Sequence, residues 1–137
     1  MAFKFEKLDV WQRAMDYTDV IDGITQRLPT TERYNLVDQM NRAVTSIALN
    51  IAEGAIGQSD AEQSRFLGYA QRSLVETVAC LHLVHRRRHL ADHAPLREAY
   101  VQAERLFRQL VAFRASLGAA PTGVYEEVVD YDLPPPF

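Results

Sequence analysis

The chain has 137 residues, of which 47% are hydrophobic and 24% charged, with 15 Lys and Arg against 18 Asp and Glu. This length fits one domain with a proper core, and the composition excludes disordered, collagen-like and disulfide-rich proteins. No apolar stretch approaches the roughly 20 residues of a membrane span, and the N-terminus lacks the apolar region of a secretory signal, so we expect a cytoplasmic protein.

Four segments show the three- and four-residue spacing of apolar side chains that is typical of amphipathic helices, and no segment reads as a strand. Short connections between long helices favour antiparallel neighbours. The predicted fold is therefore all-α, an antiparallel up-down-up-down four-helix bundle that spans residues 1–118. The expected helices lie at about 9–28, 31–56, 60–90 and 93–117.

The first two expected helices carry plain boundary signals. Asp9 is a natural N-cap for the first, and Pro29 ends it because the residue before a proline is pushed out of helical geometry. Thr30 or Thr31 can cap the second. The apolar faces are expected to hold Val10, Ala14, Tyr17, Ile21, Ile24 and Leu28 in the first helix, and Leu36, Met40, Val44, Ile47, Ile51 and Ala52 in the second.

The last two expected helices are bounded in the same way. Ser59 and Glu62 form a candidate capping box at the start of the third. Pro95 falls in the first turn of the fourth, and Gly118 is its expected stop. The apolar faces are expected to hold Phe66, Ala70, Leu74, Thr77, Leu81 and Val84, and then Leu96, Tyr100, Ala103, Leu106 or Phe107, Leu110, Phe113 and Leu117.

Residues 119–137 form an acidic tail that ends in Pro134, Pro135, Pro136 and Phe137. The segment has no helical period, and its prolines forbid a regular helical ending, so we expect an extended arm. Two interpretations stay open: a frayed terminus, or an acidic and aromatic strip that docks on its own bundle or on a neighbouring subunit.

A polar stripe runs along the second expected helix beside its apolar face. At 100° per residue its members fall within about 80° of one another. Ser and Asn are poor helix formers, and a stripe meant only for water would use Lys, Glu and Gln. We interpret it as a polar seam against another helix or subunit, with an ordinary exposed face as the alternative. Its members are Gln39, Arg42, Ser46, Asn50 and Glu53.

The four histidines cluster near the end of the third expected helix, at positions 82, 85, 89 and 93. His85 and His89 would lie one turn apart on a continuous helix, which makes them weak candidates for a metal site. The favourable interaction of cationic side chains with a helix C-terminus explains the same cluster without any ligand. We therefore expect neither a metal nor a cofactor. His93 is expected to lie past the helix end.

Arginines give the segment 61–118 nine basic and five acidic residues, although the whole chain carries a net charge of −3. They are candidates for contacts with RNA or DNA phosphates, and a solvated face paired with acidic neighbours is the alternative. The candidates are Arg42, Arg65, Arg72, Arg86, Arg87 and Arg88.

No arrangement of side chains in the sequence predicts catalysis. Glu53 could act as a base, but no nucleophile or metal partner stands beside it, and the glycines fit no nucleotide-binding motif. We expect that the protein is not an enzyme. Cys80 cannot form an internal disulfide and is expected to pack as a small apolar residue.

Several short motifs together carry a resemblance to a known family. They are Phe5–Ala14 (FEKLDVWQRA), Glu32–Leu36 (ERYNL), Gln39–Ala43 (QMNRA), Ser46–Gly54 (SIALNIAEG), Arg65–Leu67 (RFL) and Ser73–Glu76 (SLVE). Over about residues 3–118 the sequence resembles the bacterial four-helix bundle family first noticed in intervening sequences of 23S ribosomal RNA genes. The resemblance implies a ring-shaped homopentamer, and the polar seam coincides with the family's signature positions.

A related branch, the accessory proteins of diversity-generating retroelements, implies binding to a reverse transcriptase and to nucleic acid. This sequence departs from the family pattern at three positions: Asn41 and Gln58 stand where arginines are expected, and Arg72 stands where a glycine is expected. The sequence therefore predicts a non-catalytic homo-oligomeric interaction or scaffold protein. The alternative is an RNA- or DNA-binding accessory protein.

Overall fold

The computed structural model describes residues 2–118 and 133–137, and its regular elements are all helical. Two short 3-10 helices, η1 (Lys4–Lys7) and η2 (Thr30–Glu32), precede the first two long helices. The four long helices are α1 (Asp9–Thr25), α2 (Leu36–Gly54), α3 (Asp60–Arg86) and α4 (Ala94–Ser116). The predicted all-α class is confirmed.

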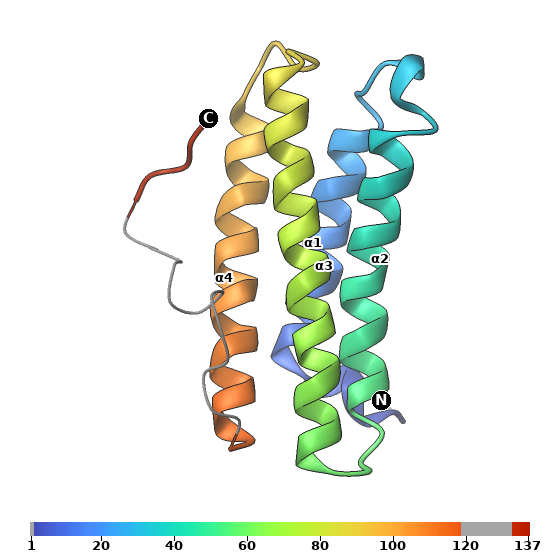
Figure 1. The fold of residues 1–137 in the computed structure, drawn as a ribbon, viewed down its shortest axis with the longest axis vertical. Helices are drawn as coiled ribbons and strands as arrows, with labels where there is room; N and C mark the ends of the chain where they lie inside the picture. The colour runs from blue at the N-terminus through green and yellow to red at the C-terminus, as the bar shows by residue number, and fades with distance from the viewer. Residues whose placement is uncertain (1, 119–132) are drawn as a thin grey trace.

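The long helices lie side by side and run alternately up and down, which confirms the predicted antiparallel bundle (Figure 1). Each helix packs against two neighbours, in the cyclic order α1, α2, α3 and α4. Within the described part of the chain, no helix has the length and apolarity that crossing a membrane requires.

The predicted apolar faces form the core with few exceptions. All five apolar residues expected on α1 itself are buried, and Leu28 packs partly buried against them. On α3 the sequence pattern was wrong by one position, since Leu67 is fully buried and Phe66 only half-buried. Phe66 instead packs edge-on against Tyr69, with ring centroids 5.7 Å apart. The stripe on α3 therefore begins one residue later than the spacing predicted.

The corner between α1 and α2 differs most from the prediction. Helix α1 ends at Thr25, and the chain reaches Leu28 through 3-10-type bonds, such as Leu28 N–H to the Thr25 carbonyl at 3.2 Å. Helix α2 begins at Leu36, five residues later than expected, and neither Thr30 nor Thr31 caps it. The N-cap of α1 is Leu8, and Asp9 is the first residue of the helix. The Asp9 carboxylate therefore interacts favourably with the helix dipole but does not cap the helix.

The corner between α2 and α3 brings two helices into very close contact. A Cβ atom added at Gly54 would lie 2.9 Å from the Cβ of Phe66, so only glycine fits at the end of α2. Ser59 caps α3 as predicted, since its Oγ accepts from the Glu62 N–H at 3.0 Å. The reciprocal half of the capping box does not form, because the Glu62 carboxylate pairs with Arg65.

Helix α3 ends at Arg86, four residues before the expected end. The Arg88 N–H donates to the His85 carbonyl at 3.0 Å, and the His89 N–H donates to the Val84 carbonyl at 3.3 Å. These two bonds define a Schellman motif. Its left-handed position is usually glycine, but here it is Arg88, with φ 56°. The motif turns the chain sharply, so His89 and His93 lie outside α3.

One buried hydrogen bond crosses the core between α1 and α3. The hydroxyls of Tyr17 and Thr77 lie 2.7 Å apart, and the Thr77 hydroxyl also donates to the Leu74 carbonyl at 2.6 Å. Because a threonine hydroxyl has one proton, Tyr17 must be the donor to Thr77. Burial raises the pKa of Tyr17 far above its ordinary value. Cys80 is buried in the same core as predicted, and burial raises the pKa of its thiol.

The end of the chain returns to the bundle beside α4 (Figure 1). Leu133–Phe137 has no helical structure, and Phe137 packs partly buried against α3 and α4 side chains. Most of the predicted tail, residues 119–132, lies outside the described residues. The prediction of an extended arm can therefore be compared with the structure only at Leu133–Phe137.

Candidate functional site

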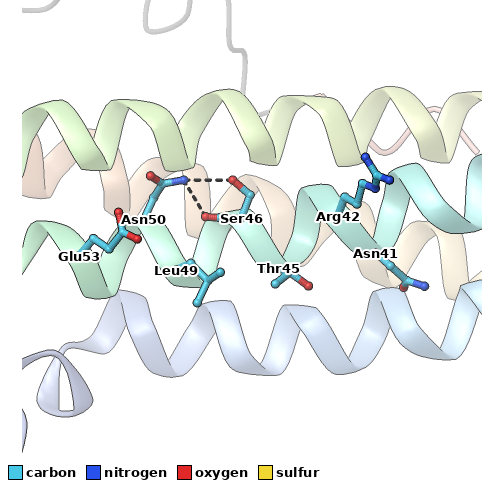
Figure 2. A pocket seen from close by; sticks show the side chains of 7 residues that line it. All are labelled: Asn41, Arg42, Thr45, Ser46, Leu49, Asn50 and Glu53. Atoms are coloured by element: carbon cyan, nitrogen blue, oxygen red, sulfur yellow. Dashed lines mark hydrogen bonds between the residues drawn. The ribbon is translucent and has the colours of Figure 1, made fainter.

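The five residues of the predicted polar seam all lie on α2, but the structure brings only two of them together. Ser46 and Asn50 are half-buried, and the Asn50 amide donates to the Ser46 carbonyl at 2.8 Å and to the Ser46 Oγ at 3.0 Å (Figure 2). Ser73 of α3 also donates to the Ser46 Oγ, at 2.9 Å. The middle of the seam is therefore bonded to a helix of its own chain.

This network fixes the direction of the Ser46 hydroxyl. Its oxygen already accepts from Asn50 and from Ser73, which uses both lone pairs. The remaining O–H group of Ser46 is thus directed away from both partners. Sequence reasoning missed Ser73, although its place beside Leu74 at the edge of the apolar stripe of α3 was a usable signal.

The other three seam residues lie on the exposed surface of α2. Gln39 donates to Asn35 at 3.4 Å, and Arg42 forms an ion pair with Asp38 at 3.2 Å, so both interact within α2 or the turn before it. Glu53 is exposed near the end of the helix. Within residues 2–118 and 133–137, none of these three side chains bonds to another long helix.

A shallow surface groove runs along the same face of α2. In Figure 2, Ser46 and Asn50 point toward α3, whereas Thr45 and Leu49 point the other way. Leu49 is 55% exposed, and its neighbours on this face, Thr45 and Ser46, have short polar side chains. Short side chains beside an exposed leucine allow a second helix to approach closely. The lining residues are Asn41, Arg42, Thr45, Ser46, Leu49, Asn50 and Glu53.

The histidines do not form the arrangement that the sequence allowed. The prediction of His85 and His89 on one continuous helix was wrong, because the Schellman motif ends α3 between them. The ring of His85 packs edge-on against that of His93, with centroids 4.8 Å apart, while His89 turns to Glu32. Across residues 2–118 and 133–137, no group of three or more His, Cys, Asp or Glu side chains is placed to hold a metal ion.

Sequence reasoning also missed a buried ionic cluster at the end of the bundle that holds the α1–α2 and α3–α4 connections. Glu32, in η2, is only 6% exposed. Its Oε2 accepts from Arg87 at 2.7 Å and lies 2.6 Å from the Nε2 of His89, and its Oε1 accepts from Asn35 at 3.0 Å. The bonds from Arg87 and then His89 lower the pKa of Glu32 to about 2. The cluster fastens the α1–α2 corner to the end of α3.

The six candidate arginines divide into two groups. Three of them pair with carboxylates: Arg42 with Asp38, Arg65 with Glu62, and Arg87 with Glu32. All six are exposed, and the other three are Arg72 and Arg86 on α3, and Arg88 just after it. Pairing neutralises half of the positive charge that the sequence offered for phosphate contacts.

The region of the chain that matches a known family covers nearly all of this bundle. The model of the family described as "23S rRNA-intervening sequence protein" matches residues 6–112, from η1 into the last turns of α4. The chain belongs to that family. No curated protein matches the chain.

Membership in the 23S rRNA-intervening sequence protein family confirms the resemblance found in the sequence. The match includes the groove-lining stretch of α2 and Ser73, which bonds to it. It also includes Gly54, whose close contact with Phe66 explains why the signature of this chain ends in glycine.

Proposed function

We propose that the protein is a non-catalytic interaction module that assembles from identical copies through the groove face of α2, as a homopentamer. The observation that carries the proposal is Leu49, which is 55% exposed on the groove face and has only polar neighbours there, among them the short side chains of Thr45 and Ser46. Protein interfaces have an apolar centre and a polar rim, and Leu49 with its polar neighbours has that composition. The number five rests on the family resemblance.

The hydrogen bonds of the groove support the same proposal. Ser46 and Asn50 are held in place by each other and by Ser73, so they would lose little side-chain entropy when a second surface packs on them. The Ser46 O–H group points away from these partners and is suited to an acceptor on another copy. The face contains no lysine, and its one arginine pairs with Asp38.

Sedimentation velocity at micromolar concentration tests this assembly. A pentamer of 15.6 kDa chains has a mass of about 78 kDa. We expect Leu49→Asp to reduce that mass to the monomer value, because a buried unpaired carboxylate disfavours the interface. Leu83→Asp is the matched control, since Leu83 is 41% exposed on α3 outside the groove. A wild-type monomer would overturn the proposal, as would dissociation by Leu83→Asp alone.

A second candidate function is binding of RNA or DNA. The observation that favours it is the exposure of Arg72, Arg86 and Arg88 along and just after α3. Binding through phosphates should weaken steeply with salt. Replacing all three by Glu should abolish binding to a structured RNA at low salt. Replacing the carboxylate-paired Arg42 and Arg65 by Glu should weaken it less. Undetectable binding by the wild-type chain would exclude this candidate.

A further inference from the structure

Three aromatic side chains from α3 and α4 contact the ring of Phe137 at the end of the bundle where α3 is joined to α4, and we call these three side chains the cup. His82 and His85 lie on α3, and Tyr100 lies on the facing turn of α4. The ring of Phe137 lies among them, with centroids 5.0 Å from His82, 5.2 Å from His85 and 5.8 Å from Tyr100. The three rings meet Phe137 at tilted or edge-on angles of 59°, 54° and 85°, which aromatic pairs favour.

The walls of this cup are braced without Phe137. His82 packs edge-on against Tyr100, with centroids 6.4 Å apart, and His85 packs against His93 at 4.8 Å. These contacts tie α3 to α4 and to the loop between them. A site whose walls contact one another costs little to organise when a ligand enters.

One polar contact orients the bound segment. Arg97, one turn before Tyr100 on α4, donates from Nη1 to the main-chain oxygen of Phe137 at 3.5 Å. The contact is made to the backbone, so it does not depend on the side chain that fills the cup. The cup thus contacts the ring of Phe137, and the Arg97 guanidinium contacts the main-chain oxygen of the same residue.

The segment in the cup is well suited to docking as a short extended peptide. Pro134, Pro135 and Pro136 fix φ near −65° and leave no N–H groups to satisfy, so the segment is largely ordered before it binds. Pro-rich peptides recognised in this conformation dock on aromatic-lined surfaces. Leu133 is 63% exposed, whereas Phe137 is partly buried, so the ring of Phe137 makes the main contact.

We propose that this cup is a binding site for proline-rich peptides with an aromatic residue after the prolines, and that Leu133–Phe137 of the same chain occupies it as a built-in competitor. The 15 peptide steps from Gly118 to Leu133 can reach at most about 50 Å, and the 23 residues of α4 span about 35 Å. The chain's own segment can therefore reach the cup, at an effective concentration on the order of millimolar. The site is separate from the α2 groove, so it does not depend on the assembly proposed above.

Nuclear magnetic resonance on the full-length chain tests the site, with the peptide acetyl-Leu-Pro-Pro-Pro-Phe-amide as the probe. In the wild type, the ring of Phe137 should shift the ring-proton signals of His82 and His85. Phe137→Ala should remove those shifts, and added peptide should restore them. The peptide should bind the wild type several-fold more weakly than Phe137→Ala, because the resident segment competes.

Three controls make the outcome decisive. Leu133→Ala, in the same segment but exposed, should leave the histidine signals unchanged. A peptide with Ala in place of Phe should not bind, and adding Tyr100→Ala to Phe137→Ala should abolish peptide binding. Equal affinity for the wild type and Phe137→Ala, or no binding to either, would overturn the proposal. Loss of the wild-type shifts on dilution would also overturn it, since it would mean that the segment docks on another copy.

Discussion

His89 Nε2 lies 2.6 Å from Oε2 of Glu32, although 57 residues separate them in the chain. The contact joins the turn before α2 to the turn after α3, on the same end of the bundle. It exists because the Schellman motif at Arg88 reverses the chain just before His89, and because η2 turns the Glu32 side chain inward. The α1–α2 corner and the α3–α4 corner thus hold each other in place.

The Glu32 cluster should make stability depend on acid. The bonds from Arg87 and His89 lower the pKa of Glu32 from 4.5 to about 2, so their contribution is complete above about pH 4.5 and is lost as pH falls toward 2. Between pH 5 and pH 2.5 we expect the wild type to lose about 1 to 2 kcal/mol more unfolding free energy than Glu32→Gln. The difference is smaller than the full pKa shift would give, because Arg87 is 43% exposed and water screens the ion pair.

Urea unfolding at the two pH values measures this difference. Asp19→Asn is the control, because it makes the same carboxylate-to-amide change at an exposed position of α1. The expectation is wrong if Glu32→Gln and the wild type respond to acid equally.

The buried Tyr17–Thr77 pair should show an asymmetric mutational response. Thr77→Val leaves the Tyr17 hydroxyl as a buried donor without its acceptor, so we expect a loss of about 2 to 3 kcal/mol. Tyr17→Phe removes the donor but leaves Thr77 bonded to the Leu74 carbonyl, so about 1 kcal/mol should be lost. The double variant should be less destabilised than the sum of the two. A double-mutant cycle by urea unfolding tests this, and strictly additive losses would contradict it.

Arg88 occupies a backbone conformation that favours glycine. Its φ is 56°, and a non-glycine residue there carries a steric cost of about 1 to 2 kcal/mol. Glycine removes this steric cost, but it also gives the unfolded chain more conformational entropy, which offsets part of the gain. We therefore expect Arg88→Gly to raise the unfolding free energy by a net of about 0.5 to 1 kcal/mol. Arg86→Gly, in the last turn of α3, should lower it by about the same amount. Thermal unfolding of both variants compares them, and a destabilised Arg88→Gly would refute this account.

Two helical glycines should respond to alanine in opposite directions. A Cβ at Gly54 would meet the Cβ of Phe66 at 2.9 Å, so Gly54→Ala should cost about 1 to 3 kcal/mol as α2 and α3 are pushed apart. A Cβ at Gly23 would have no neighbour within 4 Å, so Gly23→Ala should stabilise α1 by about 0.5 to 1 kcal/mol. Urea unfolding of the two variants measures the contrast. Equal effects would show that the close contact at Gly54 is not limiting.

The sequence alone determined the helices and the faces that they bury. The spacing of Val10, Ala14 and Tyr17 is a property of neighbours on one helix, so it can be read without knowing what packs against them. The same local reasoning placed Ser46 and Asn50 on one stripe of α2. Local signals also located Ser59 as the cap of α3 and Gly118 as the stop after α4.

Only the tertiary structure decided where the polar groups find partners. Ser73 reaches Ser46 from another helix, and on the α3–α4 interface Arg114 donates to Gln71 at 2.6 Å across 43 residues. Glu32 reaches His89 because α1 ends at Thr25 and α3 at Arg86, both before the bounds that the sequence predicted. Helix periodicity arises from contacts within a few residues. These bonds depend on how separate helices are placed relative to one another, which no local spacing records.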